Sequence, residues 1–212
     1  MSTINIDFGL PGTAPNSAFG GAGSPGLWNV IDRATVSGFT GGPILDINGQ
    51  STSLMITTSQ TMNDVTPSSQ PFSPTLAPLL GDYLVGGANT FTMTFLGLPE
   101  GLYKFVIYAT GRQDFPRATT ITPVGDLSAQ TSVSGVYSGG LAEGVTHSTL
   151  VRSVGKSGIA FQISSPSDGF INGIQIAPIP EPSSAILFGF ALIAAISQRK
   201  RICEQAAPSN GG

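Results

Sequence analysis

Apolar and polar residues alternate in short segments along most of the sequence. Near the start, Ile4, Ile6 and Phe8 are separated by Asn5 and Asp7. A period of two residues is that of a β-strand, because successive side chains point to opposite faces of a sheet. The pattern predicts a half-buried strand here. Similar segments predict strands at 28–31, 35–39, 91–95, 103–108, 119–122, 131–137, 146–154, 158–164 and 170–176.

Turn-forming residues separate these segments. Asn48-Gly49 predicts a β-hairpin within 43–58. Leu98-Pro99-Glu100-Gly101 predicts the turn of a second hairpin, whose strands pair before and after it. Residues 59–81 hold four prolines and are expected to form a long loop with a helical turn at 76–80. About ten short strands joined by turns favour an all-β fold, an antiparallel two-sheet sandwich or jelly roll.

The composition suits a turn-rich, secreted type of domain. Only 10% of the residues are charged, against about 25% in an average globular domain. Gly and Pro are abundant, and residues 9–25, which are rich in both, are expected to form an ordered loop. Residues 1–178 contain six Lys/Arg and ten Asp/Glu, a formal net charge of −4. No basic patch therefore supports nucleic-acid binding.

The sequence offers little material for a metal or cofactor site. One cysteine, Cys203, and one histidine, His147, exclude a Cys/His zinc cluster. Calcium would need clustered acidic loops, which the sequence does not show. No Gly-x-Ser-x-Gly or P-loop motif occurs, and His147, inside an alternating segment, is expected to be a structural strand residue. We therefore expect no cofactor, no metal and no catalytic residue.

The C-terminal stretch has a different pattern. Pro180-Glu181-Pro182 precedes an apolar run, and Arg199, Lys200 and Arg201 follow it. In lipid the backbone of such a run must satisfy its own hydrogen bonds, so we expect a helix. About 15 residues give roughly 22 Å of helix, which is short for a bilayer core of about 30 Å. Clustered cations should stay on the cytoplasmic side. The predicted membrane helix comprises Ser184, Ala185, Ile186, Leu187, Phe188, Gly189, Phe190, Ala191, Leu192, Ile193, Ala194, Ala195, Ile196 and Ser197.

The tripeptide, the apolar run and the basic cluster, in this order, resemble the PEP-CTERM sorting signal of Gram-negative bacteria. The resemblance covers about 25 of the 212 residues. It implies recognition by an exosortase, a membrane-embedded cysteine transpeptidase-like enzyme. It also implies cleavage near Pro180-Glu181-Pro182, with Glu181 as the recognised side chain and the prolines holding it extended.

These features divide the sequence into four parts. They are a β-sandwich domain (1–177), a Pro-rich recognition linker (178–183), the hydrophobic helix with its basic cluster (184–201) and a disordered tail (202–212). Proteins with this sorting signal normally also carry a secretory signal peptide. Residues 1–7 have no basic start and no apolar core of that kind. Either translation starts upstream of Met1, or the chain is a cytosolic β protein with an apolar tail.

Two segments of the first part, FTMTFLGLPEGLYKFVIYATG and GFINGIQIA, resemble galactose-binding-like jelly rolls. On such a domain Trp28 and Tyr83 would stack on sugar rings. Arg112 and Asp114, in a loop at one end of a sheet, would hydrogen-bond sugar hydroxyls. The alternatives are that the two aromatic residues fill the core and that the two polar residues belong to a solvated loop.

We therefore expect a non-enzymatic surface or extracellular-matrix protein that an exosortase processes and whose sandwich binds glycan, with exopolysaccharide as a partner. It would be anchored transiently in the membrane of the cell envelope and then reach the cell surface or the extracellular space. The alternative is a polysaccharide-acting hydrolase or lyase on a jelly-roll scaffold. Glycoside hydrolysis needs a converging pair of carboxylates, and no spacing in the sequence selects one.

Overall fold

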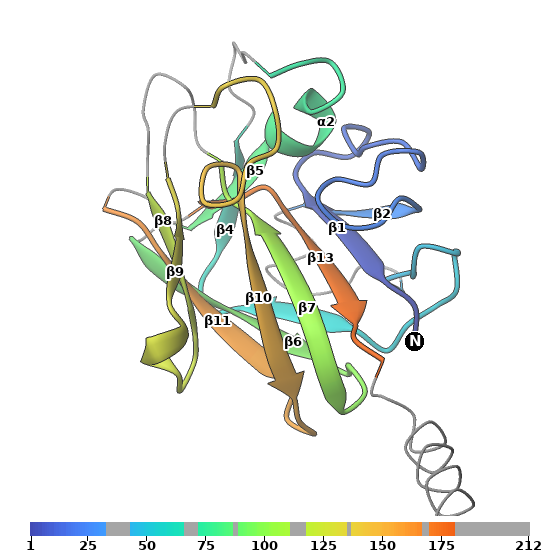
Figure 1. Ribbon diagram of the computed structural model, residues 1–212, viewed down its shortest axis with the longest axis vertical. Coiled ribbons are helices and arrows are strands. Elements are labelled where there is room, and N and C mark those ends of the chain that lie inside the picture. Colours follow the sequence, from blue (N-terminus) through green and yellow to red (C-terminus); the bar gives the residue numbers. More distant parts are fainter. Residues whose placement is uncertain are drawn as a thin grey trace, which may run out of the picture. The chain divides into compact units, whose positions relative to one another are not determined.

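Short strands arranged in sheets form the framework of the computed structural model (Figure 1), which describes residues 1–32, 43–65, 72–86, 89–110, 118–134, 137–166 and 170–180. Residues 1–179 form one compact unit, and Pro180 begins a second. The predicted strand at 35–39 and the sorting-signal residues from Glu181 to Arg201 lie outside the described residues. In the part of the chain that the structure describes, no helix is long and apolar enough to cross a membrane.

The first sheet has five strands in the order β10-β7-β13-β1-β2. Their bounds are β10 (His147–Val154), β7 (Gly101–Tyr108), β13 (Gly173–Pro178), β1 (Ile4–Phe8) and β2 (Trp28–Ile31). The neighbours are antiparallel except for β1 and β2, which run parallel with Asn5 opposite Trp28. The last described strand, β13, therefore lies in the middle of this sheet.

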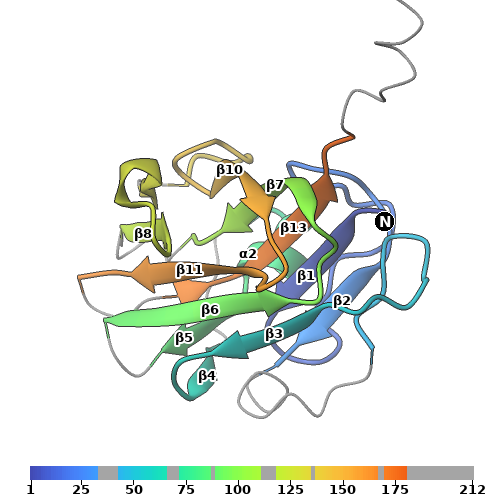
Figure 2. The ribbon, with the colours of Figure 1, turned by 90° about the horizontal axis from the view of Figure 1, so that it is seen from below.

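The second sheet also has five strands, in the order β3-β6-β11-β8-β9, all antiparallel. It consists of β3 (Met55–Thr58), β6 (Thr90–Leu96), β11 (Ile159–Ser164), β8 (Thr119–Pro123) and β9 (Thr131–Val133). Figure 2 shows β11, β6 and β3 side by side, facing the strands of the first sheet. The all-β sandwich that the sequence predicts is thus confirmed, and its two large sheets are antiparallel except for the pair β1–β2.

A third, smaller sheet joins β12 (Phe170–Ile171), β5 (Tyr83–Gly86) and β4 (Met62–Val65). Two short helices complete the described elements. They are α2 (Ala77–Leu80), which confirms the predicted helical turn, and the 3-10 turn η1 (Leu127–Ala129).

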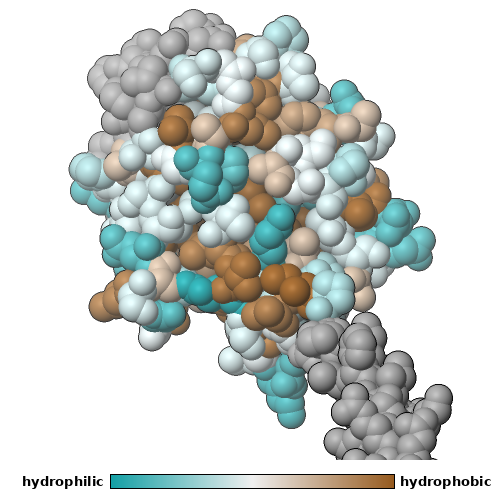
Figure 3. Space-filling view, viewed as in Figure 1, coloured by the Kyte–Doolittle hydropathy of each residue, from teal (hydrophilic) through white to brown (hydrophobic). Residues whose placement is uncertain are grey.

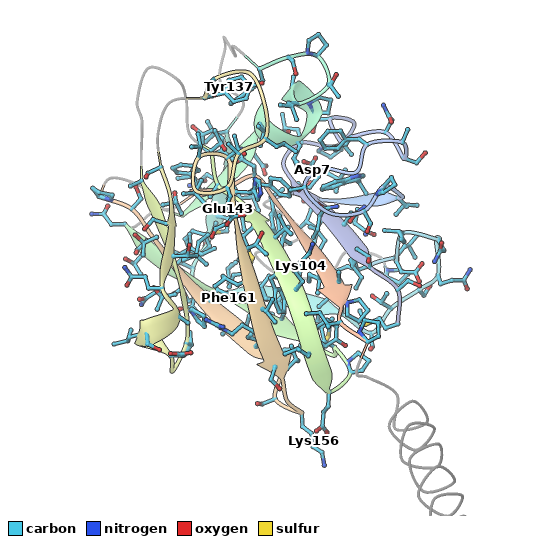
Figure 4. The ribbon with its side chains drawn as sticks, in the orientation of Figure 1. Asp7, Lys104, Tyr137, Glu143, Lys156 and Phe161 are labelled. Carbon is cyan, nitrogen blue, oxygen red and sulfur yellow. The ribbon has the colours of Figure 1, made fainter. Side chains whose placement is uncertain are left out.

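Aromatic rings fill the space between the two large sheets. Phe161 of β11 lies with its ring centroid 5.1 Å from that of Phe105 and 6.0 Å from that of Phe95. All three side chains are at most 1% exposed, and Figure 4 marks Phe161 within this layer. Along β6 buried residues alternate strictly with more exposed ones. The sequence period therefore assigns the inward face correctly.

The predicted pairing of 91–95 with 103–108 is wrong. The turn at Leu98–Gly101 leads from β6 in the second sheet to β7 in the first, so the two strands face each other across the core. Phe95 and Phe105 lie with their ring centroids 6.2 Å apart in this arrangement. The alternation of polarity fixes which face of a strand is buried, but it does not choose the neighbouring strand.

Three other expectations need correction. The turn at Asn48-Gly49 forms, but only the isolated bridge between Leu45 and Ser51 follows it, and β3 pairs with β6 instead. The predicted loop at 59–81 contains β4. β1 is buried on both faces rather than one, because residues 9–27, called here the covering loop, and α2 lie over the outer face of the first sheet.

Phe161→Ala should lower the free energy of unfolding by about 3–5 kcal/mol, because it removes a fully buried ring and leaves a cavity between the sheets. Urea denaturation measures this change. Leu127→Ala is the control: Leu127 is 78% exposed, so its truncation should change the free energy by less than about 0.5 kcal/mol. A loss below about 1 kcal/mol for Phe161→Ala would contradict the assigned core.

Candidate functional site

The covering loop lies over a second hydrophobic cluster, on the outer face of the first sheet. Val106 and Tyr108 of β7 form its floor, and Trp28 lies at its side. The cluster also contains Phe72, Leu76, Leu79, Leu80 and Tyr137, with Ala14, Phe19, Ala22, Ala77 and Leu141 packed against it. Figure 1 shows the covering loop in blue beside β1, β2 and α2. The first sheet thus lies between the second sheet on one face and the covering loop with α2 on the other.

A buried polar network attaches the covering loop to the sheet. The Tyr108 hydroxyl donates to Oε1 of Gln175 at 2.6 Å and accepts from the backbone N–H of Ala22 at 2.6 Å. Nε2 of Gln175 donates to Oδ1 of Asn5 at 2.9 Å and contacts the carbonyls of Gly20 and Ser24, each at 3.1 Å. Burial raises the pKa of Tyr108, so its phenol stays protonated and remains a donor.

Close approach of the covering loop to this network requires glycine at position 21. The backbone of Gly21 has φ +55°, and a Cβ there would lie 2.4 Å from the Tyr108 hydroxyl. Any larger residue would therefore push the loop off the sheet. The Gly-rich composition of this segment follows from contact with buried polar groups as well as from turn formation.

Trp28 holds Phe19 in place. The indole N–H of Trp28 donates to the carbonyl of Phe19 at 3.0 Å. The ring centroids of these two residues are 5.9 Å apart, and Trp28 lies 6.5 Å from Tyr108 on its other side. Phe19 is therefore fixed by a hydrogen bond to its backbone and by ring contacts to its side chain.

Phe19 lines a pocket of about 350 Å³ between the covering loop and the segment that leads into α2. Its lining consists of Pro15, Asn16, Ala18, Phe19, Gly20, Gly21, Pro74, Thr75 and Pro78. In the described part of the chain, Phe19 is the only aromatic residue that is not buried. This set of residues is called the Phe19 pocket below.

The Phe19 pocket combines apolar walls with a few uncharged polar groups. Phe19 and the prolines offer C–H and ring surfaces, while Asn16 and Thr75, both exposed, offer an amide and a hydroxyl. Asn16 uses its Oδ1 to accept from the N–H of Ala18 at 3.0 Å, which orients the amide. None of the lining residues that the structure describes is ionisable. Such a lining suits a neutral ligand with both apolar faces and hydroxyl groups.

The structure places the predicted sugar-stacking residues in the core. Trp28 is 7% exposed and Tyr83 is 9% exposed, and the Tyr83 ring packs on Phe170 with centroids 5.5 Å apart. The core interpretation that the sequence left open therefore applies to both. Arg112 and Asp114 lie outside the described residues. Sequence reasoning missed Phe19, whose only signal is a lone aromatic residue in a Gly- and Ser-rich loop.

Two carboxylates of the first sheet's outer side are not open to a substrate. Asp7 and Asp82 come together, but they are 0% and 2% exposed, so a substrate has no access to them. His147 lies in β10 as a structural residue, with Nε2 3.2 Å from Glu143 Oε2 and Nδ1 3.1 Å from Thr146 Oγ1. Burial lowers the pKa of His147.

No family model and no curated protein matches the chain. Among solved structures, a β-glucuronidase from Bacteroides uniformis matches at TM-score 0.43 and 17% identity. The match covers 57% of this chain and only 14% of the enzyme. A family 35 carbohydrate binding module from Clostridium thermocellum matches at TM-score 0.34 and 16% identity over 60% of this chain and 99% of the module. A family 35 module from Cellvibrio japonicus matches at TM-score 0.34 and 13% identity, over 60% of this chain and 95% of the module. No residue role carries over from matches this distant.

Tyr108→Phe should loosen the covering loop. It leaves the N–H of Ala22 and Oε1 of Gln175 without their partner, which costs about 1–3 kcal/mol of folding free energy. Denaturation measures the total loss, and hydrogen exchange at the Ala22 amide should become faster.

Tyr103→Phe is the matched control for this substitution. Tyr103 lies in the same strand, and its hydroxyl donates to the carbonyl of Pro99 at 2.9 Å, away from the covering loop. Removing that hydroxyl should leave exchange at Ala22 unchanged. Unchanged exchange at Ala22 in Tyr108→Phe would show that the network does not hold the covering loop.

Proposed function

We propose that the β-sandwich is a non-enzymatic glycan-binding domain and that the Phe19 pocket is its ligand site. The observation that carries the proposal is the position of Phe19, the one unburied aromatic ring of the described residues, in the wall of a pocket. Sugar rings present apolar C–H faces that pack on aromatic rings, and their hydroxyls pair with amides and hydroxyls such as those of Asn16 and Thr75.

The charge of the site narrows the ligand class. The described residues of the pocket lining include no ionisable side chain, and residues 1–178 have a formal net charge of −4. An acidic polysaccharide would gain no ion pair from this lining and would be repelled by the net negative charge of residues 1–178. On the face that Figure 3 shows, strongly hydrophilic residues form isolated groups among weakly polar and apolar ones. The preferred ligand is therefore a neutral glycan.

The C-terminal sequence adds a location to this role. Its order of Pro180-Glu181-Pro182, apolar run and basic cluster supports processing by an exosortase at the membrane. The protein would then be held transiently in the cell envelope and released to the cell surface or the extracellular matrix, where it would bind exopolysaccharide through the sandwich.

Phe19→Ala should weaken glycan binding about tenfold or more, because loss of ring stacking and of buried apolar area is worth at least about 1.4 kcal/mol. A polysaccharide array identifies the ligand, and titration calorimetry with the full chain then measures the dissociation constants. Phe19→Trp should keep the affinity within a few fold.

Leu127→Ala, which truncates an exposed apolar residue remote from the pocket lining, is the control and should bind like the wild type. Equal affinity of Phe19→Ala and wild type would exclude the pocket as the site. Release of reducing sugar ends from the bound polysaccharide would contradict the non-enzymatic part of the proposal.

The sorting role has a separate test in the native host. Mass spectrometry of the mature C-terminus should find the chain ending near Pro180–Pro182 in the surface fraction. Glu181→Gln should leave the full-length chain in the membrane fraction, whereas Glu204→Gln, beyond the basic cluster, should be processed normally. A cytosolic wild-type pool with residues 199–201 intact would rule out sorting without affecting the glycan-binding proposal.

A further inference from the structure

Two aspartates meet beneath the covering loop. Asp7 lies on the outer face of β1, near the end of that strand that is closer to α2 (Figure 4). Asp82 lies between α2 and β5. They are 0% and 2% exposed. Burial and the charge of Asp82 both raise the pKa of Asp7, and burial raises the pKa of Asp82 as well.

Among the described residues, three of the four carboxylate oxygens have no hydrogen-bond partner: Oδ1 and Oδ2 of Asp7 and Oδ1 of Asp82. The fourth, Oδ2 of Asp82, accepts from the N–H of Leu10 at 2.9 Å and from the hydroxyl of Thr13 at 2.7 Å. A buried carboxylate without a partner is costly, and two adjacent ones repel each other. The negative charge of Asp64 raises the pKa of Asp82 further.

The surrounding residues hold this arrangement in place. Nδ2 of the buried Asn172 donates to the carbonyl of Asp82 at 3.0 Å and to that of Leu80 at 3.2 Å. A Cβ at Gly9 would lie 2.2 Å from Oδ2 of Asp82, so only glycine leaves room for this carboxylate. The position of Asp82 is thus fixed from its backbone and from its side chain.

We propose that Asp7 and Asp82 bind a hard cation, best matched by Ca²⁺, through the three oxygens that lack hydrogen bonds. Ca²⁺ accepts carboxylate, carbonyl and water oxygens in flexible geometry. Among the described residues, no group of three or more His, Cys, Asp or Glu side chains gathers in one place. Backbone carbonyls and water would therefore complete the shell, and an all-oxygen shell disfavours zinc.

This site differs from the sequence-based expectation of no metal, because its two carboxylates are 75 residues apart in the chain and meet only through the fold. A cation here would connect β1 with the segment after α2. Since Leu10 and Thr13 of the covering loop bind the same carboxylate, it would also stiffen the start of that loop. The proposal does not depend on glycan binding.

Thermal unfolding of the full chain, stripped with EDTA and returned to millimolar CaCl₂ at neutral pH, tests the site. A ligand well above its dissociation constant should raise the Tm of the wild type by about 5 °C or more. Asp7→Asn should remove the response to Ca²⁺. Asp126→Asn, which changes an exposed carboxylate near η1, should retain it. Metal analysis of desalted wild type should find one calcium per chain, and Asp82→Asn should lose it.

The competing explanation of the unpartnered carboxylates is that Asp7 is protonated and that no cation binds. It predicts the opposite effects of CaCl₂ and of Asp7→Asn on Tm. A carboxyl whose pKa is raised on folding makes stability fall as the pH rises from about 4 toward neutral. Asp7→Asn would then raise Tm at neutral pH, and CaCl₂ would have no effect on the wild type. That result would overturn the proposal, and so would an equal response to Ca²⁺ in wild type and Asp7→Asn.

Discussion

The hydrogen bonds among Tyr108, Gln175 and Asn5 are the interaction on which the outer half of the molecule depends. These side chains come from β7, β13 and β1, three adjacent strands of the first sheet. Together they bind the backbone of the covering loop at Gly20, Ala22 and Ser24. Buried polar groups stabilise a fold only when they are satisfied, so the loop and the sheet need each other. The contact between the covering loop and the sheet also positions the wall of the Phe19 pocket, because Gly20 and Gly21 belong to that wall.

The same contact explains why the first sheet differs from the second. β6 alternates between buried and more exposed residues, as expected for a sheet with one face toward the core. β1 is buried on both faces, with Ile4, Ile6 and Phe8 toward the other sheet and Asn5 and Asp7 under the covering loop. The apolar residues of β1 pack against the other sheet, and its polar residues lie against the covering loop. A strand can therefore show the alternation of a surface strand while lying wholly inside the protein.

This ambiguity limits what the sequence alone could predict. Local sequence patterns identified most strands, the inward face of β6 and the helical turn before Gly81. They could not choose strand partners, so the predicted hairpin between β6 and β7 was wrong. They also could not distinguish an outward residue that meets solvent from one that meets a loop. Phe19, Asp7 and Asp82 were missed for this reason, since each gains its role from segments distant in the chain.

The central position of β13 has a mechanical consequence. This strand continues directly into Ile179 and Pro180, and it is hydrogen-bonded to β1 on one side and to β7 on the other. Ile179 adds a bond from its N–H to the carbonyl of Leu102 at 2.8 Å. A pull on the chain beyond Pro180 would load both ladders in shear at once, instead of peeling an edge strand one bond at a time. A force along β13 is therefore opposed by two ladders rather than one.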